Sequence, residues 1–382
     1  MCDILKHTTM KTGDKTMKKI HRTLSLFTVA AMCAALLCSC GAVSDSSQTD
    51  SSSKAAATTT ADTTADTTTT GEASSTASAT SAPDSSVSNS SSAVTDDTKT
   101  NGITPAMWKV TSPEGNTMVM LGSFHALKDE CYPLPEAVTN AYNNADILAV
   151  ECDITSTSED GEYMKNLMKQ MLYNDNTKLS QHISEEAYSA LQTYLGYWGM
   201  DISALEVYRP WAVSSTLDTL LIQDSDFDTE KGLDNFLLTT AHADGKEIYE
   251  VESVDFQMNM LINFSDDIYD LMFRSFEGET KESQKQALED LYTAWKSGDI
   301  ETFLEEDNEE ELAGYTEEDK KIAEDYNNQM LYDRNKNMAK AAEDLMSQGK
   351  NVFYVVGAAH YAGEGGIIDL LEKDGYTAER VL

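Results

Sequence analysis

Positive charge is scarce in this chain of 382 residues. Lys and Arg together number 28 against 65 Asp and Glu, which gives a formal net charge of −37 at pH 7. A surface this acidic repels polyanions, so we expect neither nucleic acid nor anionic lipid headgroups as partners of the folded part. The acidity indicates no particular activity, because acidic faces are usually only solvated.

Long apolar runs are also missing. The stretch from Leu24 to Leu37 is too short to cross a bilayer; it follows the basic Met17-Lys18-Lys19 and ends in Leu37-Cys38-Ser39-Cys40-Gly41. This order is typical of a secretory signal, with Met17 as the expected start. The ending resembles a bacterial lipobox, which implies a lipoprotein signal peptide over residues 1–40, a diacylglycerol on Cys40, and a lipid-anchored protein facing the exterior of the bacterial cell membrane. An ordinary signal peptide is the alternative.

Aromatic residues are absent from residues 41–100, which are almost entirely Ser, Thr, Ala and Asp. Such a segment cannot bury enough apolar surface to offset the entropy lost on folding. We therefore predict a disordered linker that holds a folded domain, residues 101–382, away from the membrane.

Cysteine is nearly absent from residues 101–382, where only Cys131 and Cys152 occur. Two cysteines form no disulfide framework, and the sequence leaves open whether they pair. No serine stands in a Gly-x-Ser-x-Gly context either, so serine hydrolysis has no support.

Apolar strands alternate with helices at both ends of the folded part, around a long helical middle. This pattern predicts an α/β fold, with a mostly parallel sheet flanked by helices and a large helical insertion at about 157–240. Acidic helices are expected between Val254 and Gly349. The expected strands are 108–110 and 117–121, which form a hairpin, then 147–150, 248–251, 352–356 and 377–382.

Two of these strands end in the same motif. One runs into Gly122-Ser123-Phe124-His125 and the other into Gly357-Ala358-Ala359-His360, while two more strands end in Glu151 and Glu252. The carboxyl ends of parallel neighbours meet at one edge of a sheet, where α/β proteins bind ligands. Two imidazoles and two carboxylates there suit a divalent metal ion such as Mn, Co, Zn or Fe, which would support hydrolysis.

Each of these residues also has a structural interpretation. A single Gly-x-x-His is more often a hydrogen-bonded loop than a ligand, and Glu250 could point inward instead of Glu252. Arg334 occupies one position in the apolar stripe of a helix that is expected around 320–346. A buried arginine must be paired, either with the acids above or a substrate oxygen, or in a structural ion pair at the edge of the stripe. Arg209, just before a helix, is a second candidate cation.

These motifs, in this order, resemble the TraB/GumN (TraB/PrgY) family over nearly all of residues 105–382. The family is similar to the TIKI metalloproteases and, more distantly, to erythromycin-esterase-like (EreA-like) and ChaN-like proteins. The resemblance implies an α/β core in which His125, His360 and Glu151 form a metal centre. It rests on Leu121-Gly122-Ser123-Phe124-His125, Tyr132-Pro133-Leu134-Pro135, Val150-Glu151-Cys152-Asp153, Arg209-Pro210-Trp211, Gly232-Leu233-Asp234, Glu250-Val251-Glu252-Ser253, Asp333-Arg334-Asn335 and Val356-Gly357-Ala358-Ala359-His360.

Two functions remain open at this point. The first is a surface-anchored, metal-dependent hydrolase that cleaves an extracellular peptide. In it, His125, His360 and Glu151 hold the metal, Glu252 acts as base or further ligand, and Arg334 or Arg209 orients the substrate. The second is a non-catalytic protein that sequesters a peptide or small molecule in the same crevice.

Overall fold

The computed structural model describes residues 102–157, 161–304 and 315–382. The predicted signal peptide and linker, residues 1–40 and 41–100, lie outside these ranges. Within them, no helix combines the length and hydrophobicity needed to cross a bilayer.

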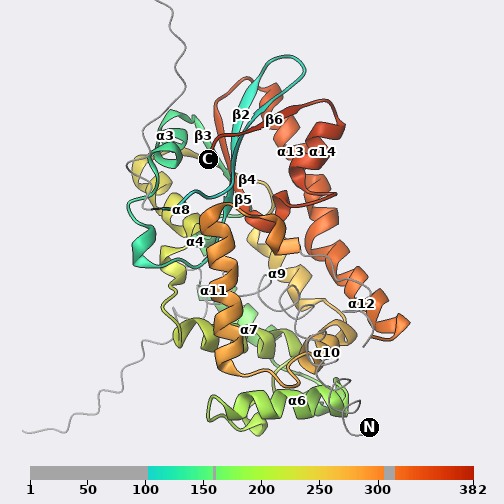
Figure 1. The fold of residues 1–382 in the computed structure, drawn as a ribbon. Helices are drawn as coiled ribbons and strands as arrows, with labels where there is room; N and C mark the ends of the chain where they lie inside the picture. The colour runs from blue at the N-terminus through green and yellow to red at the C-terminus, as the bar shows by residue number, and fades with distance from the viewer. Residues whose placement is uncertain (1–101, 158–160, 305–314) are drawn as a thin grey trace, which may run out of the picture. The chain divides into compact units, whose positions relative to one another are not determined.

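A six-stranded sheet forms the centre of the fold, with the strand order β4-β3-β5-β2-β1-β6 (Figure 1). The first four strands in this order are parallel to one another, whereas β1 is antiparallel to both β2 and β6. The predicted hairpin and the mostly parallel sheet are confirmed. The strands are β1 (Met107–Thr111), β2 (Thr117–Ser123), β3 (Ile147–Val150), β4 (Glu247–Glu250), β5 (Val352–Gly357) and β6 (Thr377–Arg380).

Helices cover the sheet and share one apolar core with it. Strands β3 and β5 are buried along their whole length, which explains their unbroken apolar sequences. The helices of this core are α3 (Glu136–Asn144), α8 (Leu233–Asp244), α11 (Lys281–Ser297), α13 (Asp333–Ser347) and α14 (Ile367–Lys373). Figure 1 shows α3 and α8 on one side of the strands and α13 and α14 on the other.

A second apolar core is made of helices alone, and its extent differs from the prediction. The expected insertion at 157–240 includes α8. In the structure α8 instead packs on the sheet, and its Leu233 N–H donates to Phe124 O at 3.0 Å. Conversely, some of the helices beyond residue 253 belong to the helical part. Its helices are α5 (Gly161–Gln170), α6 (Glu185–Gly196), α7 (Pro210–Gln223), α9 (Val254–Ile262), α10 (Asp266–Arg274) and α12 (Glu317–Asn327).

The helix expected around 320–346 is interrupted. A π-helix, Asn328–Tyr332, joins α12 to α13, and the Asp333 N–H donates to Asn328 O five residues back. A π turn widens the helix locally and often occurs at functional sites. Here it ends two residues before Arg334, the residue that stands out in the apolar stripe of the sequence.

Candidate active site

The four predicted residues follow the carboxyl ends of four parallel strands. His125 follows β2, Glu151 follows β3, Glu252 follows β4 and His360 follows β5. The carboxyl ends of these adjacent strands lie side by side at one edge of the sheet, because Ser123 pairs with Gly357 and Val150 pairs with Val355. The sequence argument for a shared edge therefore holds.

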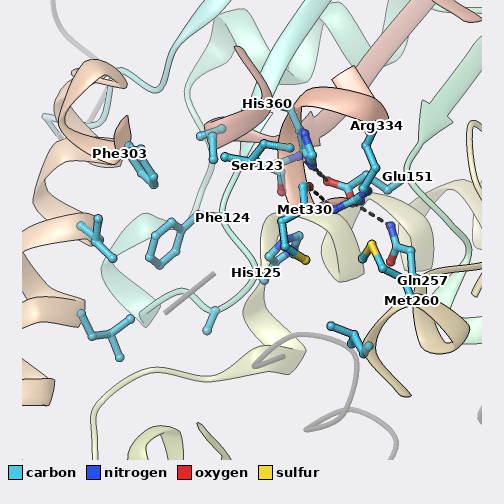
Figure 2. A pocket seen from close by; sticks show the side chains of 18 of the residues that line it. Ser123, Phe124, His125, Glu151, Gln257, Met260, Phe303, Met330, Arg334 and His360 are labelled. Carbon is cyan, nitrogen blue, oxygen red and sulfur yellow. Dashed lines mark hydrogen bonds and ion pairs between the residues drawn. The ribbon is translucent and has the colours of Figure 1, made fainter. Parts of the chain in front are cut away.

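Three of the four side chains converge on Gly357. A Cβ atom built on this glycine would lie 3.1 Å from Glu151 Oε1, 3.6 Å from His125 Nε2 and 3.6 Å from His360 Cδ2. His360 Nε2 is 3.7 Å from Glu151 Oε1. Figure 2 shows His360 and Glu151 close together, with His125 beside them. A glycine here leaves open the space that the three groups share.

Both imidazoles are held through Nδ1. His125 Nδ1–H donates to Asp234 Oδ2 at 2.7 Å, and His360 Nδ1–H donates to Asn335 Oδ1 at 2.6 Å. Ser123 Oγ also donates to Asp234 Oδ2, at 2.5 Å. A partner on one ring nitrogen fixes the tautomer that leaves a lone pair on the other, as is usual for metal-binding histidines. Nε2 is thus the nitrogen of each ring that is left to bind a ligand once it carries no proton.

Arg334 bridges the two glutamates. Its Nη2 lies 2.7 Å from Glu151 Oε2 and 2.8 Å from Glu252 Oε2, and its Nε lies 2.9 Å from Glu252 Oε1. Nη1 donates to Met330 O at 3.1 Å, at the π turn. Gln257 Nε2 donates to both carboxylates. The buried arginine of the stripe is thus paired with these acids.

Glu252, rather than Glu250, points toward this cluster. Glu250 Oε1 instead accepts a hydrogen bond from the Asp153 backbone N–H at 2.9 Å. Glu252 lies behind Arg334, however, and is not among the residues that line the pocket. The geometry therefore gives Glu252 the role of holding Arg334 and not that of a base facing a substrate.

The pKa values of the two histidines are shifted in opposite directions. Burial, with Arg334 adding to it, lowers the pKa of His360 to about 3, so this ring is neutral at pH 7. Burial also acts to lower the pKa of His125, but the Asp234 carboxylate outweighs it and raises the pKa to about 9. Burial would raise the pKa of Glu151, yet Arg334 and the imidazoles hold it below its ordinary value. His125 must therefore lose a proton before it can bind a metal.

The donor set fits a divalent metal in its chemistry. Two imidazole nitrogens and a carboxylate oxygen are common ligands of Mn, Co, Zn and Fe ions. The carboxylates of Glu151, Glu252 and Asp234 also outnumber the single guanidinium of Arg334, which favours a cation. Even so, among residues 102–157, 161–304 and 315–382 no three His, Cys, Asp or Glu side chains are already arranged to hold a metal ion. Oxygen Oε1 of Glu151 accepts the Gly357 N–H at 2.7 Å, and Arg334 and Gln257 occupy Oε2. Side chains would have to adjust for an ion to bind.

The pocket beside these groups has a volume of ≈100 Å³. Ser123, His125, Glu151, Arg334 and His360 line one part of it. Arg209 does not line it, because this residue caps the start of α7 in the helical part. The cysteines are not joined to each other: Cys131 Sγ lies 3.1 Å from Tyr292 OH and Cys152 Sγ 3.3 Å from Gln257 Oε1.

Comparison with known proteins identifies a family for this chain. The family model described as the TraB/PrgY/gumN family matches residues 106–380. A metalloprotease TIKI homolog of Nematostella vectensis is 25% identical over 292 residues, which cover 65% of this chain and 61% of that protein. The uncharacterized protein YbaP of Escherichia coli (strain K12) is 26% identical over 157 residues, 41% of this chain and 56% of that protein. The chain thus spans less than two thirds of the length of these curated relatives. No solved structure matches.

Proposed function

We propose that this chain, which belongs to the TraB/PrgY/gumN family, is a metal-dependent hydrolase that cleaves peptides. The observation that carries the proposal is the convergence of His125 Nε2, Glu151 Oε1 and the His360 ring on the space at Gly357. The likeness to TIKI metalloproteases supports it, although that likeness is distant.

In this proposal His125, His360 and Glu151 hold the ion, which when bound supplies Lewis-acid polarisation of a substrate carbonyl. Asp234 and Asn335 orient the two rings through their Nδ1 atoms. These partners fix the orientation of the two rings, which lowers the cost of assembling the ligands.

Arg334 is suited to bind the oxygen of the reacting carbonyl. A guanidinium has five N–H groups. The bonds to Glu151, Glu252 and the Met330 carbonyl use one on Nε, two on Nη2 and one on Nη1. The remaining Nη1 hydrogen belongs to a residue that lines the pocket, and a fixed donor of this kind stabilises negative charge that develops on oxygen.

A non-catalytic binding protein is the second candidate. The observation that favours it is the pairing of Glu151 with Arg334, which neutralises the carboxylate without a metal. Such a protein would bind a peptide or small molecule in the pocket and leave it intact.

Metal content and turnover of the full chain distinguish the two candidates. We expect one equivalent of Mn, Co, Zn or Fe after anaerobic reconstitution, together with cleavage of peptides in a mixed library followed by mass spectrometry. The variant His360→Ala should lose both properties. In contrast, binding of peptides without cleavage, with no metal retained, would establish the binding protein.

The location of the protein is a separate proposal. We propose that Cys40 carries a diacylglycerol and holds the protein on the outside of the cell membrane. The support is the sequence before Cys40, a basic segment and a short apolar run that ends in Leu-Cys-Ser-Cys. Replacement Cys40→Ser should release the protein from the membrane fraction, and a variant that stays membrane-bound without lipid would contradict the proposal.

A further inference from the structure

The pocket has two unlike parts. One part presents His125, Glu151, Arg334 and His360, which the proposed chemistry uses. Figure 2 shows Phe124 and Phe303 together on the other side of the pocket, away from Glu151 and Arg334. The apolar part has no role in that chemistry. The larger apolar residues of the sheet's core that line the pocket define this apolar part: Phe124, Ile222, Leu288, Leu291 and Phe303.

Packing against neighbouring side chains holds the apolar part of the pocket in place. The ring centroid of Phe124 lies 5.9 Å from that of Trp295 and 6.4 Å from that of Phe303, so neighbouring aromatic rings fix it. Leu288 and Leu291 stand three residues apart on one face of α11. Ile222 comes from the last turn of α7. With Phe303, which lies after α11 at residues 301–304, four separate segments therefore maintain this apolar surface.

We propose that the apolar part is a specificity subsite for one large apolar side chain of a peptide, at a residue adjoining the bond that is cleaved. Phe124 and His125 line the same pocket, and Figure 2 shows the Phe124 ring on the side away from Glu151 and Arg334. A peptide whose carbonyl lies at the imidazoles can therefore place a neighbouring side chain against Phe124 in the same pocket. This inference rests on the proposed function.

The size of the space limits the occupant. The whole pocket measures ≈100 Å³, while an apolar cavity of about 150 Å³ holds one benzene molecule. The apolar part is only a portion of this volume, so it has room for one apolar side chain at most and excludes a long acyl chain. The absence of charged groups among the five lining residues also disfavours Asp, Glu, Lys and Arg side chains, because a buried charge needs a partner.

The test uses the full chain reconstituted with Mn²⁺ and capped pentapeptides, Ac-Ala-Ala-X-Ala-Ala-NH₂, in which X is Gly, Ala, Leu, Met, Phe or Asp. We expect kcat/KM for Leu, Met or Phe to exceed that for Gly and Asp at least about 10-fold. In Ile222→Phe, which fills the subsite, kcat/KM should fall at least about 10-fold more for the Leu peptide than for the Ala peptide. Ile222→Ala should shift the preference toward larger side chains.

Leu172 provides the matched control. Its side chain is exposed and lies outside the pocket, so Leu172→Phe and Leu172→Ala should leave the order of preference unchanged. Equal rates for all six peptides, or the same loss for every peptide in Ile222→Phe, would overturn the subsite.

A second measurement separates failure of the subsite from failure of the hydrolase. If the wild-type chain cleaves none of the peptides, saturation-transfer NMR with the same peptides still reports binding. Contact with the Leu side chain, lost in Ile222→Phe and kept in Leu172→Phe, supports the subsite in a binding protein. Equal signals from the Leu and Asp peptides, or displacement of the Leu peptide by decanoate bound at one equivalent, would refute it.

Discussion

Replacement of Arg334 by methionine removes the cation that pairs with the buried carboxylates of Glu151 and Glu252. The side chains of Arg334, Glu151 and Glu252 are only 6%, 11% and 5% exposed. Breaking a buried ion pair by removing one partner costs about 3–5 kcal/mol, mainly because the other charge stays buried and unpaired. We expect Arg334→Met to lower the free energy of unfolding by about this amount in the absence of divalent ions.

A divalent ion should restore part of this loss. It would bind next to the carboxylates left by Arg334, so the stabilisation by ions should be larger in Arg334→Met than in the wild-type chain. Ligand at 100 times its Kd stabilises a protein by about 2.7 kcal/mol. Urea unfolding followed by circular dichroism, in EDTA and in Mn²⁺, measures both effects.

Arg274 is the matched control. It also contacts two carboxylates, Asp270 and Asp319, but its side chain is 31% exposed. Arg274→Met should therefore cost less, and Mn²⁺ should not rescue it. A cost below about 1 kcal/mol for Arg334→Met, or equal stabilisation by Mn²⁺ in both variants, would refute the reasoning.

Three further substitutions test other parts of the account. His360→Ala should abolish metal uptake and turnover, whereas His182→Ala, which removes an Nδ1–carboxylate bond outside the pocket, should change neither in metal analysis and peptide assays. Gly357→Ala places a methyl group 3.1 Å from Glu151 Oε1, so metal uptake should fall at least about 10-fold in a protein that still folds; Gly196→Ala, with open space around it, is the control, and normal uptake in Gly357→Ala would contradict the site. Asp218 is buried, its Oδ2 has no partner among the described residues, and burial raises its pKa well above the ordinary value. Its folded-state pKa lies above the unfolded one, so stability falls as pH rises from about 4; Asp218→Asn should stabilise the protein by about 1–3 kcal/mol at pH 7 and by almost nothing near pH 4, as chemical denaturation at the two pH values would show.

The sequence predicted the parts of the site that depend on strand ends. Parallel strands bring their carboxyl ends to one edge, so His125, Glu151 and His360 could be placed together from apolar runs and the residues that follow them. Arg334 could be found because it interrupts an apolar stripe.

The partners of these residues could not be predicted in the same way. Asp234 and Asn335 lie on helices, and their contacts with the two histidines depend on how α8 and α13 pack against the sheet. Both stand in motifs of the family, but no local pattern indicates which ring nitrogen they bind. The position of Glu252 behind Arg334 likewise follows from tertiary packing, since alternation along the strand does not distinguish a ligand from an ion-pair partner.

The division of the fold into two apolar cores is the feature that the sequence predicts least well. Helical periodicity identifies an apolar face but not the surface that this face covers. The sequence therefore places α8 in the helical insertion, whereas in the structure α8 packs on the sheet. The π turn before Arg334 has no sequence signal of its own, because one continuous apolar stripe runs through it.

Anomalous scattering from a crystal of the full chain grown with Mn²⁺, Co²⁺ or Zn²⁺ tests the metal centre most directly. The account predicts one peak at the space beside Gly357, about 2.0–2.3 Å from His125 Nε2, His360 Nε2 and a Glu151 oxygen. A fully occupied peak elsewhere, or none at this position with Arg334 still bound to Glu151, would contradict it.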